Sequence, residues 1–410
     1  VASNFCITAP GSHIISARNS GGYISKSGTS MAAPMVSGVA ALVMEAFPYL
    51  TIEQIRTIML NTAIDLGDPG VDSVYGWGLV NAASAVGGIQ ILSSASLEIN
   101  DEVDSTWSNN ISGSGGFTKN GNGVLTLSGD NTFTGDTIVN AGTLVLNGSI
   151  KSQLTIGSVG TLSGGGLIEG NVQMSGTLSP GESAGTVTFS KALTLNADSQ
   201  TIMDIDGTNL EGGAGSHDRI NLTGSAGVFT AGGVIKPLLR GISGDANNNF
   251  IPEIGQSFSI INATGGISNS FASLTQPSEG LRANSRFDLL YGVNDINLVT
   301  TPASYKTSVT NMALKPDILL NLADAIDIVR SSAGVKLTGE NQTFFDALYP
   351  LNESEVNDAI ISLSGNLPSS LPVEHIGLQH DLVHQINHQS QFMPNVPPAS
   401  LSRTLWQAGS

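Results

Sequence analysis

The stretch that decides the fold of the N-terminal region is Gly28-Thr29-Ser30-Met31-Ala32-Ala33-Pro34, followed by Met35-Val36-Ser37-Gly38-Val39-Ala40-Ala41-Leu42-Val43. Gly28 supplies a permissive backbone for a sharp turn. The small and apolar residues after it predict a helix that runs to about Ala46. Pro34 lies near the start of this helix, where proline is less disruptive than in mid-helix. A helix that is apolar on nearly every side belongs in a large core, so we expect this one to be buried.

Ser30 falls at the start of the predicted helix. The backbone N–H groups there lack partners within the helix, and the positive end of the helix dipole lies beside them. This arrangement stabilises a developing oxyanion, and a neighbouring base would turn the hydroxyl into a nucleophile. The simpler alternative is that Ser30 is an N-cap serine of a core helix.

Gly28 to Pro34, with Val36-Ser37-Gly38, resembles the nucleophile motif of subtilisin-like serine proteases. Ala9-Pro10-Gly11 is similar to the family's element before the serine, and 75–82 to the segment that closes the catalytic domain. The resemblance implies that Ser30 is the acylating nucleophile and that its own N–H helps to bind the oxyanion. It also implies an oxyanion and substrate-cleft lining made of Ser27, Gly28, Thr29, Ser30 and Met31.

The rest of the triad is not found at the family's positions. In this family the order is Asp, then His, then Ser. No Asp or Glu precedes Glu45, and His13 is the one histidine before Ser30. We therefore expect the acid, the base and the side-chain oxyanion donor to lie upstream of Val1, so that this fragment is inactive by itself. A surface-loop role is the favoured interpretation of His13.

Two residues near the motif carry further expectations. Met35 stands where the resembling proteases usually have a histidine, which we interpret as a packing residue. Cys6 is the single cysteine, which is either a buried hydrophobe or, in a secreted protein, half of a disulfide. In the resembling secreted proteases a second cysteine often lies a few residues upstream, so the resemblance makes Cys6 a disulfide candidate.

Local signals predict two more helices in this region. Thr51 and Gln54 form a capping box for a helix with an apolar stripe made of Ile52, Ile55, Ile58 and Met59. Asn81 caps a short helix through Val86, and the Gly, Pro and Asp residues of 65–72 predict a turn cluster.

Length and composition limit the classes of protein to consider. A chain of 410 residues is long enough for two or three domains. The net charge of -17, with only 12% charged residues, argues against a nucleic-acid partner. No uninterrupted run of 18 apolar residues occurs, so we expect no membrane-spanning helix. The first residues lack the features of a signal peptide.

From Phe117 to about Thr300 the sequence consists of short β-prone runs separated by Gly, Asn, Asp and Ser. Gly-Thr-Leu recurs at Gly142, Gly160 and Gly176, with spacings of 18 and 16 residues. Repeats of this length predict a right-handed parallel β-helix with a continuous apolar column. The side chains expected to point inward are those of Leu125, Leu144, Leu154, Leu162 and Leu178. An antiparallel sandwich is the competing architecture.

This region also resembles a known family. Residues 117–135 and 137–146 are similar to the passenger repeat of autotransporters, and 176–181 and 216–220 to later parts of the same passengers. From Ser304 the pattern becomes helical, with apolar residues at helical spacing over Asp317–Val329, Phe344–Leu348 and Val356–Leu363. It resembles the helical segment before the outer-membrane barrel, and 405–410 resembles the start of the first barrel strand.

The histidines His380, His384 and His388 would share one face of a helix, a geometry that zinc or nickel could use. A solvated polar face is the favoured interpretation, and we expect no metal site.

These observations predict a multidomain chain: the C-terminal part of an α/β subtilisin-like peptidase domain at 1–88, a linker at 89–116, a right-handed parallel β-helix passenger stem at 117–303, an α-helical linker segment at 304–400 and the start of a truncated barrel at 401–410. The resemblance implies a secreted or surface-displayed serine endopeptidase of a Gram-negative bacterium, acting on proteins or peptides. We expect no cofactor, no nucleic-acid partner, a monomer, and attachment to the outer membrane. The alternative is a structural or adhesive passenger that carries a degenerate protease domain.

Overall fold

The computed structural model describes residues 3–93, 96–181, 183–309 and 316–364. The chain divides into two compact units. The first comprises Val1–Glu182, Thr186–Gln200 and Ile220–Thr230, and the second Ser183–Gly185, Thr201–Arg219 and Ala231–Ser410. The histidines His380, His384 and His388 and the expected barrel start lie outside the described residues.

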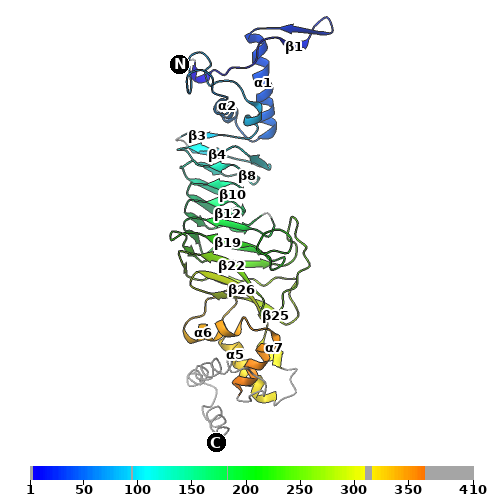
Figure 1. The fold of residues 1–410 in the computed structure, drawn as a ribbon, viewed down its shortest axis with the longest axis vertical. Coiled ribbons are helices and arrows are strands. Elements are labelled where there is room, and N and C mark those ends of the chain that lie inside the picture. Colours follow the sequence, from blue (N-terminus) through cyan, green and yellow to red (C-terminus); the bar gives the residue numbers. More distant parts are fainter. Residues whose placement is uncertain (1–2, 94–95, 182, 310–315, 365–410) are drawn as a thin grey trace. The chain divides into compact units, whose positions relative to one another are not determined.

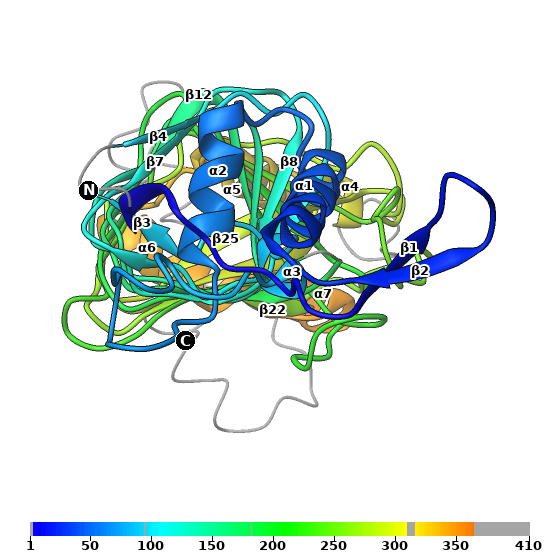
Figure 2. The same ribbon diagram turned by 90° about the horizontal axis from the view of Figure 1, so that it is seen from above.

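The first unit opens with helices and a hairpin (Figure 1). The helices are η1 (Ser3–Phe5), α1 (Thr29–Ala46), α2 (Ile52–Asn61) and α3 (Ala82–Ala85). Strands β1 (Ile14–Ala17) and β2 (Tyr23–Lys26) pair antiparallel and extend away from α1 and α2, as Figure 2 shows from above.

Helix α1 has the predicted length but not the predicted burial. It ends at Ala46, as expected, yet only Val39 and Val43 are buried. The expectation of a buried helix is therefore wrong for the described residues, because their elements cover one stripe of α1 and leave Met35, Leu42 and Met44 exposed. With a mean hydropathy of 1.3, α1 also meets the length and composition of a membrane span, a test that core helices of soluble proteins pass as well.

The predicted caps of the next two helices are confirmed. Thr51 and Gln54 form a complete capping box at the start of α2, and the Asn81 side chain accepts a hydrogen bond from Ser84 at the start of α3. Three members of the predicted α2 stripe are buried. Ile52 is 80% exposed, because it occupies the first helical position and points away from the packed face.

Short strands stack after the helices (Figure 1). Those of the first unit are β3 (Ile91–Leu92), β4 (Leu97–Ile99), β5 (Ser105–Trp107), β6 (Ser112–Gly113), β7 (Phe117–Lys119), β8 (Val124–Leu127), β9 (Asp130–Asn131), β10 (Thr137–Leu146), β11 (Ser149–Ile150), β12 (Leu154–Gly164), β13 (Leu167–Ile168), β14 (Val172–Met174), β15 (Thr177–Pro180), β16 (Thr186–Phe189), β17 (Leu193–Leu195) and β20 (Phe229–Thr230). Strands β18 (Gln200–Asp204) and β19 (Arg219–Leu222) each have residues in both units.

The strands of the first unit that carry the repeats pair in parallel. Leu144 of β10 lies opposite Leu125 of β8 and Leu162 of β12, and Leu162 lies opposite Leu178 of β15. Gly142 and Gly160 are partners in the same register. All five leucines predicted to point inward are buried. Parallel pairing excludes an antiparallel sandwich for these strands, because hairpin neighbours would run in opposite directions.

Residues 89–116, expected to be a linker, contain strands. β4 pairs in parallel with β7, β5 with β8, and β3 with β6. The Ser, Gly and Asn content of this stretch concealed strands of only two or three residues, whose single inward side chains give no periodicity to detect.

The second unit contains β21 (Val234–Leu238), β22 (Ser257–Ala263), β23 (Ile267–Ser268), β24 (Ser273–Leu274), β25 (Ser285–Tyr291) and β26 (Asp295–Pro302). β22 and β25 both pair antiparallel with β26. This departs from the parallel repeats expected through residue 303. For β25 and β26 the physical reason is the short turn between them, closed by a hydrogen bond from Gly292 N–H to the Asp295 carbonyl, since a parallel crossover needs a much longer connection.

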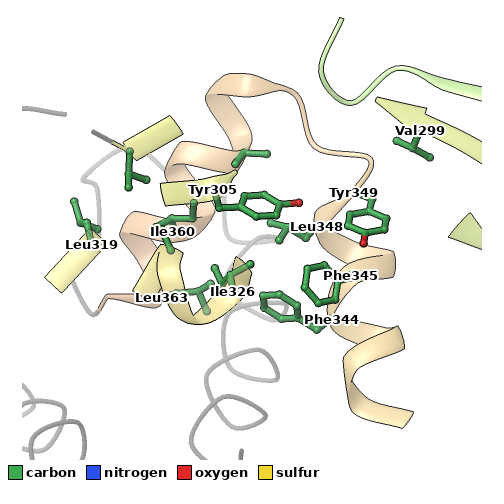
Figure 3. Packing of buried hydrophobic residues seen from close by; sticks show 13 residues of the cluster. Val299, Tyr305, Leu319, Ile326, Phe344, Phe345, Leu348, Tyr349, Ile360 and Leu363 are labelled. Atoms are coloured by element: carbon green, nitrogen blue, oxygen red, sulfur yellow. The ribbon is translucent and has the colours of Figure 1, made fainter. Parts of the chain in front are cut away.

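The helical pattern after Ser304 is confirmed for the described residues. The helices are α4 (Tyr305–Val309), α5 (Pro316–Val329), α6 (Gly339–Leu348) and α7 (Glu353–Leu363). Their apolar faces form one core with Val299 of β26, shown in Figure 3. Ile318, expected on the apolar stripe of α5, is 43% exposed, whereas Leu319 and Ile326 are buried.

Candidate active site

The turn before α1 brings two glycines together. Gly28 caps the helix with a φ of 151°, a region that favours glycine. Its N–H donates to the Gly11 carbonyl at 2.7 Å, and its own carbonyl accepts from the N–H groups of Met31 and Ala32. A Cβ at Gly11 would lie 2.8 Å from the Gly28 carbonyl oxygen, too close for any other residue. The motif that contains Gly11 and the one that contains Gly28 are thus direct neighbours.

Ser30 lies in the first turn of α1 and is exposed. The helix begins at Thr29, one residue before the expected start. Among the described residues, no acceptor takes the backbone N–H of Ser30, whereas the Met31 N–H already donates to Gly28 at 3.0 Å. An unengaged N–H at the positive end of an 18-residue helix can donate to an anion.

Ser27 and Met31 flank this position in different ways. The Ser27 hydroxyl accepts a hydrogen bond of 2.9 Å from the His13 N–H, so it fixes the loop that enters the helix. Met31 is half-buried, and its sulfur would lie 3.8 Å from a Cβ placed on Gly28. Ser27, Gly28, Thr29 and Ser30 are all exposed. The five predicted lining residues therefore form one accessible turn, and their roles in binding stay predictions.

His13 is not placed as a base for Ser30. Its ring nitrogen Nδ1 lies 2.9 Å from the Ser12 hydroxyl, and its backbone is held by Ser27. Within the described part of the chain, no hydrogen bond joins His13 to Ser30. This position fits the interpretation of His13 as a surface-loop residue.

The predicted closing segment lies beside residues 6–8, where Thr8 forms an isolated parallel bridge with Leu79. Thr8 N–H donates to the Gly78 carbonyl and Val80 N–H to the Thr8 carbonyl, each at 2.8 Å. Trp77 N–H donates to the Cys6 carbonyl at 3.0 Å, and a Cβ at Gly76 would lie only 2.4 Å from that oxygen. Cys6 itself is an exposed free thiol, so its disulfide stays a prediction.

A hollow of about 450 Å³ exists elsewhere in the first unit. It is lined by Ala46, Phe47, Val86, Asp104, Ser105, Thr106, Val124 and Thr126, and none of the predicted site residues is among them. In the described residues, no cluster of three or more His, Cys, Asp or Glu side chains could hold a metal ion.

The comparison with protein families agrees with this local structure. The model of the subtilase family matches residues 1–78, which contain the Gly28 turn, Ser30 and the Thr8–Gly78 pairing. The similarity to the subtilase family is confined to these 78 residues. The passenger-associated-transport-repeat model matches residues 117–146, which comprise β7 to β10. The chain thus joins a segment that matches subtilases, residues 1–78 and here called the subtilase segment, to a segment that matches a passenger repeat, residues 117–146.

Several curated proteins are similar to parts of the chain. An extracellular serine protease of Serratia marcescens is 34% identical over 187 residues, covering 31% of this chain and 18% of that protein. The Neisserial autotransporter lipoprotein NalP of Neisseria meningitidis is 39% identical over 108 residues, covering 25% of this chain and 10% of NalP. A thermostable alkaline protease of Halalkalibacterium halodurans is 49% identical over 79 residues, 19% of this chain and 21% of that protein. The chain therefore spans only a small part of each relative's length.

The sequence analysis did not single out Phe47, the residue directly after α1. It is buried, and its ring meets that of Trp107 of β5 edge-on. An aromatic residue directly after a helix with an apolar stripe was the available signal.

Proposed function

We propose that this chain is part of a subtilisin-like serine endopeptidase exported by the autotransporter route, with Ser30 as the acylating nucleophile. The observation that carries the proposal is the exposed Ser30 in the first turn of α1, with its N–H unengaged, inside the subtilase segment. The names of the relatives, extracellular serine proteases and an autotransporter lipoprotein, support the same activity and a location outside the cell or on its surface.

In the proposed mechanism the Ser30 hydroxyl attacks the scissile carbonyl of a protein or peptide substrate. The Ser30 N–H and the helix dipole stabilise the oxyanion that forms, while Ser27, Gly28, Thr29 and Met31 line the cleft. The base and acid are the family's His and Asp, which precede the serine in chain order. These 410 residues supply neither at the family's positions, so the chain alone should not hydrolyse peptides. The chemistry proposed needs no metal or organic cofactor.

The strand repeats are proposed to form a right-handed parallel β-helix that serves as the passenger stem. The matching registers of β8, β10, β12 and β15 support this, because each repeat returns to the same position beside the last. We propose peptidase residues at 1–88 and place the start of the stem at β3, which moves it into the stretch first assigned to a linker. Residues 304–400 would precede the outer-membrane anchor. A monomer without a nucleic-acid partner is part of the proposal.

The alternative is a structural or adhesive passenger whose protease domain is degenerate. It differs from the main proposal in one measurable property, the reactivity of Ser30 in the full-length protein.

The test compares Ser30→Ala with Ser37→Ala in the full-length protein. Ser37 lies on the same helix, is exposed, and donates to the Ala33 carbonyl at 3.3 Å, so it controls for loss of a serine from α1. We expect Ser30→Ala to abolish both casein hydrolysis and covalent labelling by a fluorophosphonate, and Ser37→Ala to keep both. Normal turnover in Ser30→Ala would show that another residue is the nucleophile. Absent labelling of the unmodified protein would favour the adhesive alternative.

A further inference from the structure

A row of aromatic rings runs from the end of α1 into the strand stack of the first unit. The aromatic row consists of Phe47, Trp107, Phe117 and Phe133, and all four side chains are 0–1% exposed. The ring of Phe47 meets that of Trp107 edge-on at 6.4 Å between centroids. Trp107 lies 6.2 Å from Phe117, and Phe117 lies 5.9 Å from Phe133. Such contacts add to the free energy of burying the rings themselves.

Phe47 is connected directly to the buried stripe of α1. It is the C-cap of the helix, and its N–H donates to the Val43 carbonyl at 2.9 Å. Val39, Val43 and Phe47 are spaced four residues apart, so they lie on one face of the helix. Among the described residues, Val39 and Val43 are the only buried side chains of α1 itself, so the contact between Phe47 and Trp107 ends the stripe by which the described elements hold this helix.

Trp107 also contacts the chain after α3. A Cβ at Gly88 would lie 2.8 Å from Trp107 Cγ, so only glycine allows this approach. The Asn109 amide donates to the carbonyls of Ser84 and Gly88 at 2.7 and 2.6 Å. The indole ring thus contacts both Phe47 and the Gly88 backbone.

Polar contacts surround the aromatic row where the helices meet the first strands. The Tyr49 hydroxyl lies 2.8 Å from that of Ser105, and the Gln54 amide donates to the Glu98 carbonyl at 2.7 Å. The Asn61 amide donates to the Ile91 carbonyl at 3.2 Å. A buried aromatic centre inside a polar rim is the anatomy of a specific interface. Helices of the subtilase segment and strands β3 to β5 therefore form a specific joint within the first unit.

We propose that Trp107 is a positioning residue for the helix that carries Ser30. Trp107 acts through Phe47: it fixes the C-terminal end of α1, and the helix, about 27 Å long, transmits that orientation to its first turn. The strand stack would then be required for the geometry of the nucleophile as well as for export. The catalytic part of this inference rests on the proposed function, whereas the coupling between Trp107 and α1 does not.

The coupling is tested by amide hydrogen exchange in the 410-residue chain. Trp107→Leu should raise exchange in residues 39–46 of α1 about tenfold, which corresponds to roughly 1.4 kcal/mol of local stability. Trp107→Phe should restore most of the protection, because an aromatic ring again meets Phe47. Phe133→Leu, at the far end of the aromatic row, is the matched control and should change the exchange rates of α1 by less than about twofold. Equal effects of Trp107→Leu and Phe133→Leu on α1, or no effect of Trp107→Leu, would overturn the coupling.

The catalytic consequence is tested in the full-length protein by the rate of fluorophosphonate labelling of Ser30, normalised to folded protein. We expect Trp107→Leu to label about fivefold more slowly and to lower kcat at unchanged KM, while Phe133→Leu and Trp107→Phe stay within about twofold. Labelling of Trp107→Leu at the normal rate would remove the positioning role and leave the proposed function intact. If unmodified protein fails to label at Ser30, the proposed function is wrong, and the exchange result still decides the coupling.

Discussion

Helix α1 and strand β10, both in the first unit, differ in how many of their side chains are buried by neighbouring elements. β10 buries alternate side chains, among them Val139, Leu144 and Leu146, because parallel strands on both sides present matching residues. α1 has nearly twice as many residues as β10 but buries only Val39 and Val43. A repeat supplies its own neighbours from the next stretch of sequence, whereas a single apolar helix depends on particular contacts with unrelated elements. Changes within the stack should therefore cost more than changes at the helices.

The largest effect is expected for Leu144→Asp. Leu144 is fully buried between Leu125 and Leu162, so the new carboxylate would have no partner in either neighbouring strand. We expect the free energy of unfolding to fall by more than about 4 kcal/mol in urea titrations. Val145→Asp is the matched control: Val145 is only half-buried, because it points to the other face of the strand, and its cost should stay below about 1 kcal/mol. Equal losses in the two variants would mean that the two faces of β10 are wrongly assigned.

The second-largest effect is expected for the buried ion pair of Lys119 and Asp101, which lies in the same strand stack. Lys119 lies in register with Ile99 and Val139, and its ammonium donates to Asp101 at 2.8 Å and to the Gly121 carbonyl at 2.7 Å. Both charged side chains are 0% exposed. Lys119→Met should cost about 3 kcal/mol, because it leaves the Asp101 carboxylate buried without a counter-ion.

The double variant Lys119→Met with Asp101→Leu supplies the control. It should recover most of that loss, since a buried ion pair is often no more stable than apolar residues of similar volume. Unfolding free energies of the two single variants and the double variant give the coupling energy of the pair. A double variant as unstable as the sum of the single variants would show that the ion pair adds no mutual stabilisation.

The recurrence of Gly-Thr-Leu made the strand stack predictable. Gly-Thr-Leu recurs at spacings of 18 and 16 residues, and in the structure Gly142 lies beside Gly160 and Leu144 beside Leu162. Gly142 adopts a φ of 66°, and a Cβ there would lie 2.5 Å from Lys119 Nζ. The repeated glycine was visible in the sequence, but the burial of Lys119 beside it was not, because a single lysine in a polar stretch resembles a surface residue.

The sequence could not specify the direction in which strands pair or which side chains pack against α1. The β-prone runs after Ser257 gave no sign that β22 and β25 pair antiparallel with β26, since alternation is the same in both directions. The capping box of α2 and the turn before α1 were predictable, because they depend on neighbours three or four residues away. The site was predicted as a motif, but the role of Trp107 depends on a contact across 60 residues of sequence with Phe47.

The third-largest effect concerns Asp204 and Asp218 in the second unit, for which, unlike Asp101, no ion pair with a cation is found in the described residues. Burial, with a smaller contribution from the charge of Asp206, raises the pKa of Asp204 to about 6. Burial and the charge of Asp204 also raise the pKa of Asp218 well above its usual value. The folded state thus favours the protonated acids, so this stability is fully present below about pH 4 and is lost as the pH rises through about 6. Asp204→Asn should stabilise the chain above pH 6, on the order of 2 kcal/mol.

The control for this pH dependence is Asp206→Asn. Burial tends to raise the pKa of Asp206, but hydrogen bonds from the N–H groups of Gly215, Asn247 and Asn248 outweigh it and lower the pKa. Its stabilisation is therefore present at neutral pH and lost in acid, the opposite sign to Asp204. Thermal unfolding of both variants from pH 2 to 8 measures the two slopes, because the contribution of Asp206 is lost only below about pH 4. Parallel slopes for Asp204→Asn and Asp206→Asn would contradict the assignment of the titrating group.

The smallest effect is expected at the start of α2, where stability is local. The Thr51 hydroxyl accepts from the Gln54 N–H at 3.3 Å, and the Gln54 side chain accepts from the Thr51 N–H at 2.7 Å. Thr51→Ala removes only the first bond and should cost about 1 kcal/mol, whereas Thr51→Ser should cost almost nothing. Gln54→Leu removes the second bond and also the 2.7 Å donation to the Glu98 carbonyl of β4. If urea unfolding shows a larger loss for Gln54→Leu than for Thr51→Ala, α2 is held by the strand stack in addition to its own cap. Equal losses would confine its stability to the cap and weaken the case that the helices depend on β4.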